Sequence, residues 1–258
     1  MRRPRALIFA IPLTRLRMSR LLRLLAPALA CALPLSAQEA DAPVTKFTAD
    51  FGYVAVSGNT ETTTLSVGEK WTRKSGRLTL EQNFGIIRGS LNGVENTNLL
   101  RTGVRAEYTI GGHFSWYAGA AFDRNPFAGI ERRFEEQAGL QYRPVANPTD
   151  TIRFEGGASA TQQTSVDGTR LNFPAARAAG AWRHQFSTDA YFVQSVEVLP
   201  NLQDGEDYRV NSESSIIAPI SQRIALRLGY LIRYDNLPEP TFSTTDRLFT
   251  TAIQLTFE

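Results

Sequence analysis

The sequence is short of the residues that build cross-links and metal sites. Its 258 residues include one cysteine, Cys31, and two histidines, His113 and His184. A single cysteine cannot form a disulfide within the chain, and two distant histidines leave little for a site built on imidazole or thiolate. We therefore expect no disulfide framework, no metal and no cofactor.

Long apolar runs are also missing. A membrane-spanning helix needs roughly 18 to 20 consecutive apolar residues, and no stretch of this sequence approaches that length. The 42% of hydrophobic residues therefore excludes a helical membrane protein.

Acidic residues are absent from the first 37 positions, which carry seven arginines followed by the apolar run 24–35 and the small pair Ser36-Ala37. A basic start, a short apolar segment and a small terminal residue are typical of a secretory signal peptide. We predict such a signal over residues 1–37, in which Cys31 belongs to the apolar segment that export removes. Met1 and Met18 both remain possible starts.

This segment also explains the basic character of the chain. The whole sequence carries 28 basic and 25 acidic residues, a net charge of +3. Without residues 1–37 there remain 21 basic and 25 acidic residues, a net charge of −4. The mature chain is acidic, so we expect no nucleic-acid partner.

From Lys46 onward, apolar residues recur at every second position. The clearest segment is 223–236, where Ile224, Leu226 and Leu228 begin one face while Arg227, Gly229 and Arg233 lie on the other. Period-two alternation predicts strands with two different faces. Twelve such strands are predicted, at about 46–57, 62–73, 77–88, 98–110, 113–124, 132–143, 151–162, 171–183, 189–199, 208–219, 223–236 and 245–257. After a short lead over 38–45, a single domain covers residues 46–258.

The connections between these strands alternate in length. Those after odd strands are longer and polar, such as 89–97 and 125–131, whereas those after even strands are short, such as 74–76; the segment 144–150 is the exception. Long loops at one rim and short turns at the other are typical of an outer-membrane barrel. Three tryptophans next to short turns fit an aromatic girdle at the membrane interface: Trp71, Trp116 and Trp182. We predict a closed, antiparallel, up-and-down transmembrane β-barrel.

A soluble β-sandwich is the alternative fold, in which the charged face of the strands would be exposed to water. In a barrel the same face would line the interior. On a lipid-facing surface each charge costs roughly 2 to 4 kcal/mol at the midplane, so in a barrel these residues must point inward. The candidate lumen residues are eight arginines and seven acids: Arg101, Arg105, Arg133, Arg153, Arg177, Arg209, Arg227 and Arg233, with Glu81, Glu107, Asp123, Glu135, Glu155, Glu213 and Asp235. Acid and arginine often stand two positions apart, as in Arg105 and Glu107.

Several motifs resemble a known family. They are Phe51-Gly52-Tyr53, the tip at 57–62, Trp71, Gly76-Arg77, the run 228–235 and Thr244-Thr245-Asp246. Together they resemble the salt-induced outer-membrane protein family, a domain family of unknown function, over nearly all of residues 46–257. The resemblance implies an outer-membrane barrel of Gram-negative type and a link to salt or envelope stress, but no established activity.

The resemblance also implies partners for the mature chain. These are the outer-membrane lipid with its lipopolysaccharide, and the assembly machinery that reads the last strand of a barrel, here ending at Phe257. The sequence departs from the usual pattern because Glu258 follows that aromatic residue. Oligomeric state is left open.

Catalytic groups are sparse. A lipid hydrolase needs a serine nucleophile within reach of a histidine base, whereas His113 and His184 both fall at predicted short turns. The acidic tip 204–207 matches no calcium loop. We therefore expect no enzymatic activity.

The remaining functions concern the lumen. Nearly equal numbers of inward arginines and acids predict a narrow, weakly selective pore or a closed barrel with a charge-paired lumen. A structural or interaction protein of the outer membrane is the alternative, and a channel for anions or acidic oligosaccharides ranks lower because the acids balance the arginines.

Overall fold

The fold is described for residues 42–58 and 60–257 of a computed structural model. The predictions for residues 1–37, and for the terminal Glu258, concern positions outside this range. Twelve strands and one short 3-10 helix form in the described residues: β1 (Val44–Val56), β2 (Thr62–Ser75), β3 (Leu78–Leu91), β4 (Val94–Gly111), β5 (Phe114–Asn125), η1 (Pro126–Ala128), β6 (Ile130–Ala146), β7 (Asp150–Ser165), β8 (Arg170–Gln185), β9 (Tyr191–Pro200), β10 (Tyr208–Pro219), β11 (Ile224–Asp235) and β12 (Thr245–Phe257).

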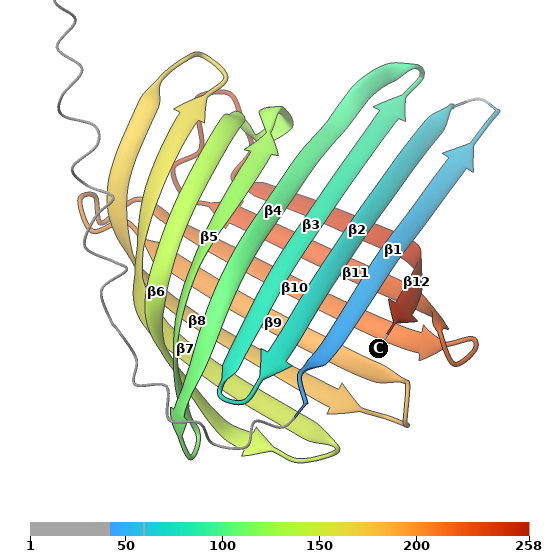
Figure 1. The fold of residues 1–258 in the computed structure, drawn as a ribbon. Coiled ribbons are helices and arrows are strands. Elements are labelled where there is room, and N and C mark those ends of the chain that lie inside the picture. The colour runs from blue at the N-terminus through green and yellow to red at the C-terminus, as the bar shows by residue number, and fades with distance from the viewer. Residues whose placement is uncertain (1–41, 59, 258) are drawn as a thin grey trace, which may run out of the picture. The chain divides into compact units, whose positions relative to one another are not determined.

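The strands form one closed antiparallel sheet. Each strand pairs with its neighbours in the sequence, and β1 pairs with β12, where Phe47 lies opposite Phe257. In Figure 1, β1 to β5 form the near wall and β9 to β12 the far wall. The predicted twelve-stranded barrel is confirmed, and the sandwich alternative is wrong because a single sheet closes on itself. Closure gives every described strand two neighbours, and the β1–β12 ladder pairs Phe47–Phe51 with Ile253–Phe257.

Within the described part of the chain, no helix has the length and apolar character that a membrane crossing by a helix requires.

The two ends of the barrel differ in their connections. The turns after even strands, at 76–77, 112–113, 147–149, 186–190 and 220–223, lie at the end where β1 begins and β12 ends. We call this end the short-turn rim. The opposite end carries the connections after odd strands, including the longest, 236–244, and is called the long-loop rim.

Several predicted connections are longer than those of the structure, and two of them bear on the rim pattern. The segment 89–97 is not a loop, because β3 and β4 extend until only Asn92 and Gly93 join them. Both residues have positive φ, 51° and 78°, which a tight hairpin turn of type I′ requires. The segment 144–150 is shorter than expected because β6 continues to Ala146, so the predicted exception to the rim pattern disappears.

The alternation of faces explains why these sequences form strands of a barrel. Large apolar side chains such as Phe51, Phe249 and Phe154 are more than half exposed on the outer face. Polar side chains such as Gln141, Thr161 and Arg209 are buried on the inner face. The interior of the barrel, rather than an apolar core, therefore holds the polar residues, as in membrane barrels.

Some outward positions break the apolar pattern, and their polar groups satisfy one another. Glu69 on β2 accepts a hydrogen bond from Gln82 on β3. Gln194 on β9 donates to Ser212 on β10 at 3.0 Å and accepts from Ser214. Pairing between adjacent strands lowers the cost of placing these groups on an otherwise apolar surface.

Candidate functional site

The structure brings the predicted lumen residues together in three groups on the inner face. The central group contains Arg105, Glu107, Arg153, Glu155 and Arg177; the loop-rim group contains Arg101, Asp123, Arg133, Glu135, Arg209, Arg233 and Asp235; the side group contains Glu213 and Arg227. Glu81 lies apart from them and pairs with Lys70 at 3.2 Å.

The central group is built around Glu155 on β7. Its carboxylate accepts two hydrogen bonds from Arg105 on β4, at 2.8 and 3.2 Å, and one from Arg177 on β8 at 2.7 Å. The side chains of Glu155 and Arg177 are only 4% and 8% exposed. Short, charge-assisted contacts among buried groups fix their geometry firmly.

Tyr117, which the sequence analysis did not single out, completes this group from β5. Its hydroxyl accepts a hydrogen bond from Arg177 at 2.7 Å. The Arg105 guanidinium lies 4.0 Å from the centre of its ring, within the range of a cation–π interaction. Gln141 of β6 further links the group by donating to Glu107 at 2.8 Å. The central group therefore joins β4 through β8 across part of the lumen.

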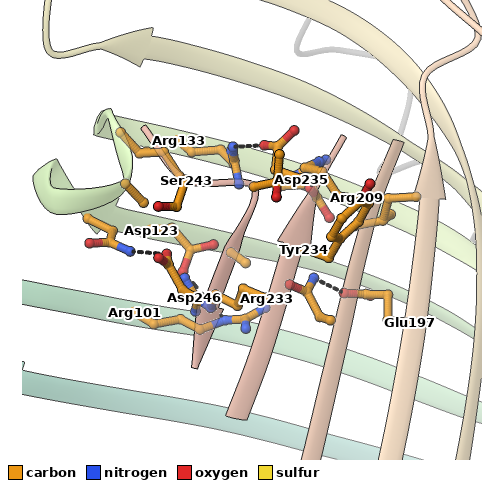
Figure 2. Close-up of a pocket in the computed structure, with 18 residues that line it drawn as sticks. Arg101, Asp123, Arg133, Glu197, Arg209, Arg233, Tyr234, Asp235, Ser243 and Asp246 are labelled. Atoms are coloured by element: carbon orange, nitrogen blue, oxygen red, sulfur yellow. Dashed lines mark hydrogen bonds and ion pairs between the residues drawn. The ribbon is translucent and has the colours of Figure 1, made fainter. Parts of the chain in front are cut away.

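The loop-rim group connects opposite walls of the barrel. Arg233 on β11 lies 3.5 Å from Asp123 on β5, and these strands are half the circumference apart. Arg209 on β10 binds Glu135 on β6 at 2.9 Å. Figure 2 shows side chains from both walls converging on the same space. Direct bridges between opposite walls mean that this half of the lumen is not one wide channel.

The side group depends on Asp50, which the sequence analysis missed. Arg227 on β11 donates to Asp50 on β1 at 2.6 Å and to Glu213 on β10 at 2.8 Å. Gln254 of β12 donates to the other oxygen of Asp50 at 2.9 Å. The alternation of β1 could have revealed Asp50. Phe47 and Phe51 stand four positions apart and share the apolar face, so Asp50 falls on the opposite, inward face.

A second missed acid is Glu197 on β9, a segment whose faces the sequence pattern leaves ambiguous. It accepts hydrogen bonds from Arg177 at 2.7 Å and from Asn211 at 3.1 Å. The lumen arginines therefore pair with acids that the sequence analysis did not predict, Asp50 and Glu197. Most of the short contacts join different strands: Arg105 lies 3.9 Å from Glu107 of its own strand but 2.8 Å from Glu155.

The connection 236–244 between β11 and β12 covers part of the long-loop rim. Its Glu239 accepts hydrogen bonds from Gln163 at 3.3 Å and from the Ser165 hydroxyl, both on β7. Gly129 has a left-handed φ of 79°, and a Cβ there would lie 2.8 Å from Glu239. Thr241 of the same connection has a φ of 77°, a conformation that costs a β-branched residue about 1 to 3 kcal/mol. The hydrogen bonds of Glu239 stabilise this connection across the rim and offset the backbone strain at Thr241.

The wall formed by β2 and β3 is lined differently. Inward glycines Gly68 and Gly85 face each other in register. Among the described residues, no atom lies within 4 Å of a Cβ built on Gly85, and the nearest to one on Gly68 is an Asp50 oxygen at 3.6 Å. The neighbouring Lys70 side chain is 51% exposed. Small residues therefore leave open space along this wall.

The three tryptophans all lie on the outer face near the short-turn rim. Trp71 pairs with Phe47, and Trp116 pairs with Tyr108, which lies 6.0 Å away ring to ring. Trp182 donates to Asp150 at 2.9 Å. The girdle role of Trp71, Trp116 and Trp182 stays a prediction.

The histidines also lie at this rim. His113 belongs to the turn after β4, and His184, near the end of β8, contacts Asp150 at 2.8 Å. Across residues 42–58 and 60–257, no group of three or more histidine, cysteine or acidic side chains could hold a metal ion.

Comparison with known proteins supports the fold. An outer-membrane channel from Pseudomonas putida F1 superposes with a TM-score of 0.51 at 12% identity, covering 83% of this chain and 95% of that one. More distant matches are an anion-selective porin from Comamonas acidovorans (TM-score 0.41, 8% identity, 85% and 100% covered) and the translocator domain of the autotransporter NalP from Neisseria meningitidis (0.41, 14%, 84% and 88%). At these identities the likeness concerns the fold.

A search of curated proteins found no significant match. A family model does match residues 49–257, which is nearly the whole barrel. This agrees with the membership of a domain family without assigned function that the sequence motifs predicted. The chain belongs to the family described as protein of unknown function, DUF481.

Proposed function

We propose that this chain is an outer-membrane barrel that works as a narrow, weakly selective pore for small hydrophilic solutes. The observation that carries the proposal is the unequal filling of the lumen. Ion pairs join β5 and β6 to β10 and β11, whereas inward glycines leave space along β2 and β3. Water and small solutes would pass along the glycine-lined wall.

Weak selectivity follows from the charges beside that path. Lys70 is paired with Glu81 at 3.2 Å, and Arg101, 39% exposed, lies 3.6 Å from Asp123. Both of these cations have an acid nearby, so neither sign of solute charge is strongly favoured. A strongly anion-selective channel remains the lower-ranked proposal for the same reason.

The second candidate is a closed barrel with a structural or interaction role in the envelope. The bridges between opposite walls favour it, because buried and mutually bonded arginines and acids stiffen the lumen rather than line a path. The two candidates differ in one measurable property, the conductance of the refolded barrel.

The experiment uses two glycines that have equal room for a side chain. Gly85 faces the lumen on β3, and Gly156 faces outward on β7; among the described residues nothing lies within 4 Å of a Cβ at either position. In planar bilayers, Gly85→Trp should remove more than half of the single-channel conductance, whereas the matched Gly156→Trp should leave it unchanged. A wild-type barrel that does not conduct would establish the closed alternative, and equal effects of both variants would refute the path along β3.

The cellular setting is part of the proposal. Export by the predicted signal would bring the chain to the outer membrane, where lipid and lipopolysaccharide surround the apolar outer face. The assembly machinery would read the last strand, whose Phe257 ring lies 6.2 Å from that of Phe47. We further propose that the barrel has no catalytic role, and that it responds to salt or envelope stress as its family resemblance implies.

A further inference from the structure

A cavity lies inside the long-loop half of the barrel. It has a volume of about 50 Å³, and four arginines and five acids line it together with Ser243 and Thr244 from the 236–244 connection and the start of β12. That volume is room for roughly four water molecules, comparable to a solute the size of glycine. None of the residues that line it belongs to β2 or β3, the strands of the glycine-lined wall.

Two arginines of this cavity, Arg101 and Arg233, make fewer close contacts than Arg105 and Arg177 of the central group. Arg101 and Arg233 share one carboxylate, Asp123, at 3.6 and 3.5 Å. Direct guanidinium–carboxylate hydrogen bonds are about 2.7 to 2.9 Å long. The buried Nε–H of Arg233 has no acceptor among the described residues. These two guanidinium groups therefore have donors free for the carboxylate of a solute.

Acids on the facing strands are similarly weakly paired. Asp246 on β12 accepts a single hydrogen bond, from Asn125 at 3.5 Å. Asp235 lies 3.8 Å from its partner, Arg133, and its side chain is 29% exposed. Figure 2 shows Asp246 next to Arg233. A carboxylate and a guanidinium that each make few short hydrogen bonds therefore border the same space. A cationic group of a solute would find its partner here.

From this arrangement we infer that the cavity binds a small zwitterion, whose carboxylate contacts Arg101 and Arg233 and whose cationic group contacts Asp246. A solute with one charge is disfavoured, because an anion also meets five acids and a cation also meets four arginines. A zwitterion satisfies both sets at once, as complementary charge placement requires. The inference does not rest on solute passage, since a closed barrel contains the same cavity.

The test is a titration of the refolded barrel in detergent micelles with glycine, acetate and methylammonium. The NMR signal of the Arg233 Nε–H, assigned through Arg233→Lys, reports binding. Glycine should shift this signal saturably with a dissociation constant on the order of 1 mM. Acetate and methylammonium should bind more weakly than glycine by a factor of about ten or more. Equal binding of acetate would overturn the inference in favour of an anion site, and no saturable shift with any of the three would overturn it altogether.

Two variants locate the site. Asp246→Asn should remove the preference for glycine over acetate while leaving the signal of Arg233 observable. The control Arg124→Lys changes an arginine that pairs with Glu131 on the outer surface at 3.4 Å, and should leave glycine binding as in the wild type. Heat-modifiable gel mobility verifies that each variant is folded. Retention of the glycine preference in Asp246→Asn would contradict the assignment of the cationic end.

Discussion

Glu155 offers the sharpest test of the central group. Its carboxylate receives three hydrogen bonds from Arg105 and Arg177, and its side chain is 4% exposed. Glu155→Gln keeps the shape of the side chain but leaves two buried guanidinium groups without their shared counter-charge. Removing one partner of a buried ion pair costs about 3 to 5 kcal/mol, and we expect a loss of this size in the free energy of unfolding.

The matched control is Glu131→Gln at the long-loop rim. Glu131 also pairs with an arginine, Arg124, but the two side chains are 48% and 34% exposed and lie 3.4 Å apart. Exposed pairs contribute about 0 to 1 kcal/mol, so this variant should unfold almost as the wild type does. Urea unfolding in lipid vesicles, followed by tryptophan fluorescence, measures both. Equal losses, or a loss below about 1 kcal/mol for Glu155→Gln, would refute the view that this carboxylate stabilises the barrel interior.

Three further predictions follow from the same structure. Gly157→Val should prevent folding, because its Cβ would lie against the backbone of β6 inside van der Waals contact; loss of the heat-modifiable gel band measures this. Gln82→Leu should cost about 1 to 3 kcal/mol by leaving the outward Glu69 without its donor, and urea unfolding should recover when Glu69→Leu is added. In the 166–169 connection, hydrogen bonds from the backbone and hydroxyl of Thr169 hold the pKa of Asp167 below its usual range. The stability that this lowered pKa contributes is fully present above the pKa of the unfolded state, about 4. It is lost as the pH falls through the pKa of the folded state. A carboxyl NMR titration should show the pKa rising in Thr169→Val.

Much of the fold follows from short-range patterns. Alternation in 223–236 assigns Arg227, Arg233 and Asp235 to one face, and these side chains form ion pairs inside the barrel. Strand lengths were harder to predict. Polar residues within 89–97 suggested a loop. The start of β4 extends past the end of β5, where polar side chains fit either face, and only Asn92 and Gly93 carry a turn signal.

Alternation predicted much of the inward charged set, whereas it did not predict Asp50, Glu197 and Tyr117 or the contacts between strands. The pattern predicted inward charges in nearly equal numbers and a charge-paired lumen, but it did not predict which strands the pairs join. In the structure, Arg105 bonds to Glu155 three strands away rather than to Glu107. Spacing along one strand determines whether a side chain lies on the inner or the outer face. The curvature of the closed sheet determines which distant strand that side chain contacts.

By itself the sequence determined the number of strands, the faces of most of them and the polar character of the interior, because each depends on a period of two residues and on turn chemistry. Tertiary structure alone decided that β5 and β6 are bridged to β10 and β11, that the 236–244 connection covers part of the long-loop rim, and that Arg101 and Arg233 share one acid. These features depend on which strands face each other across the closed barrel, and that relation is absent from any local segment of the chain.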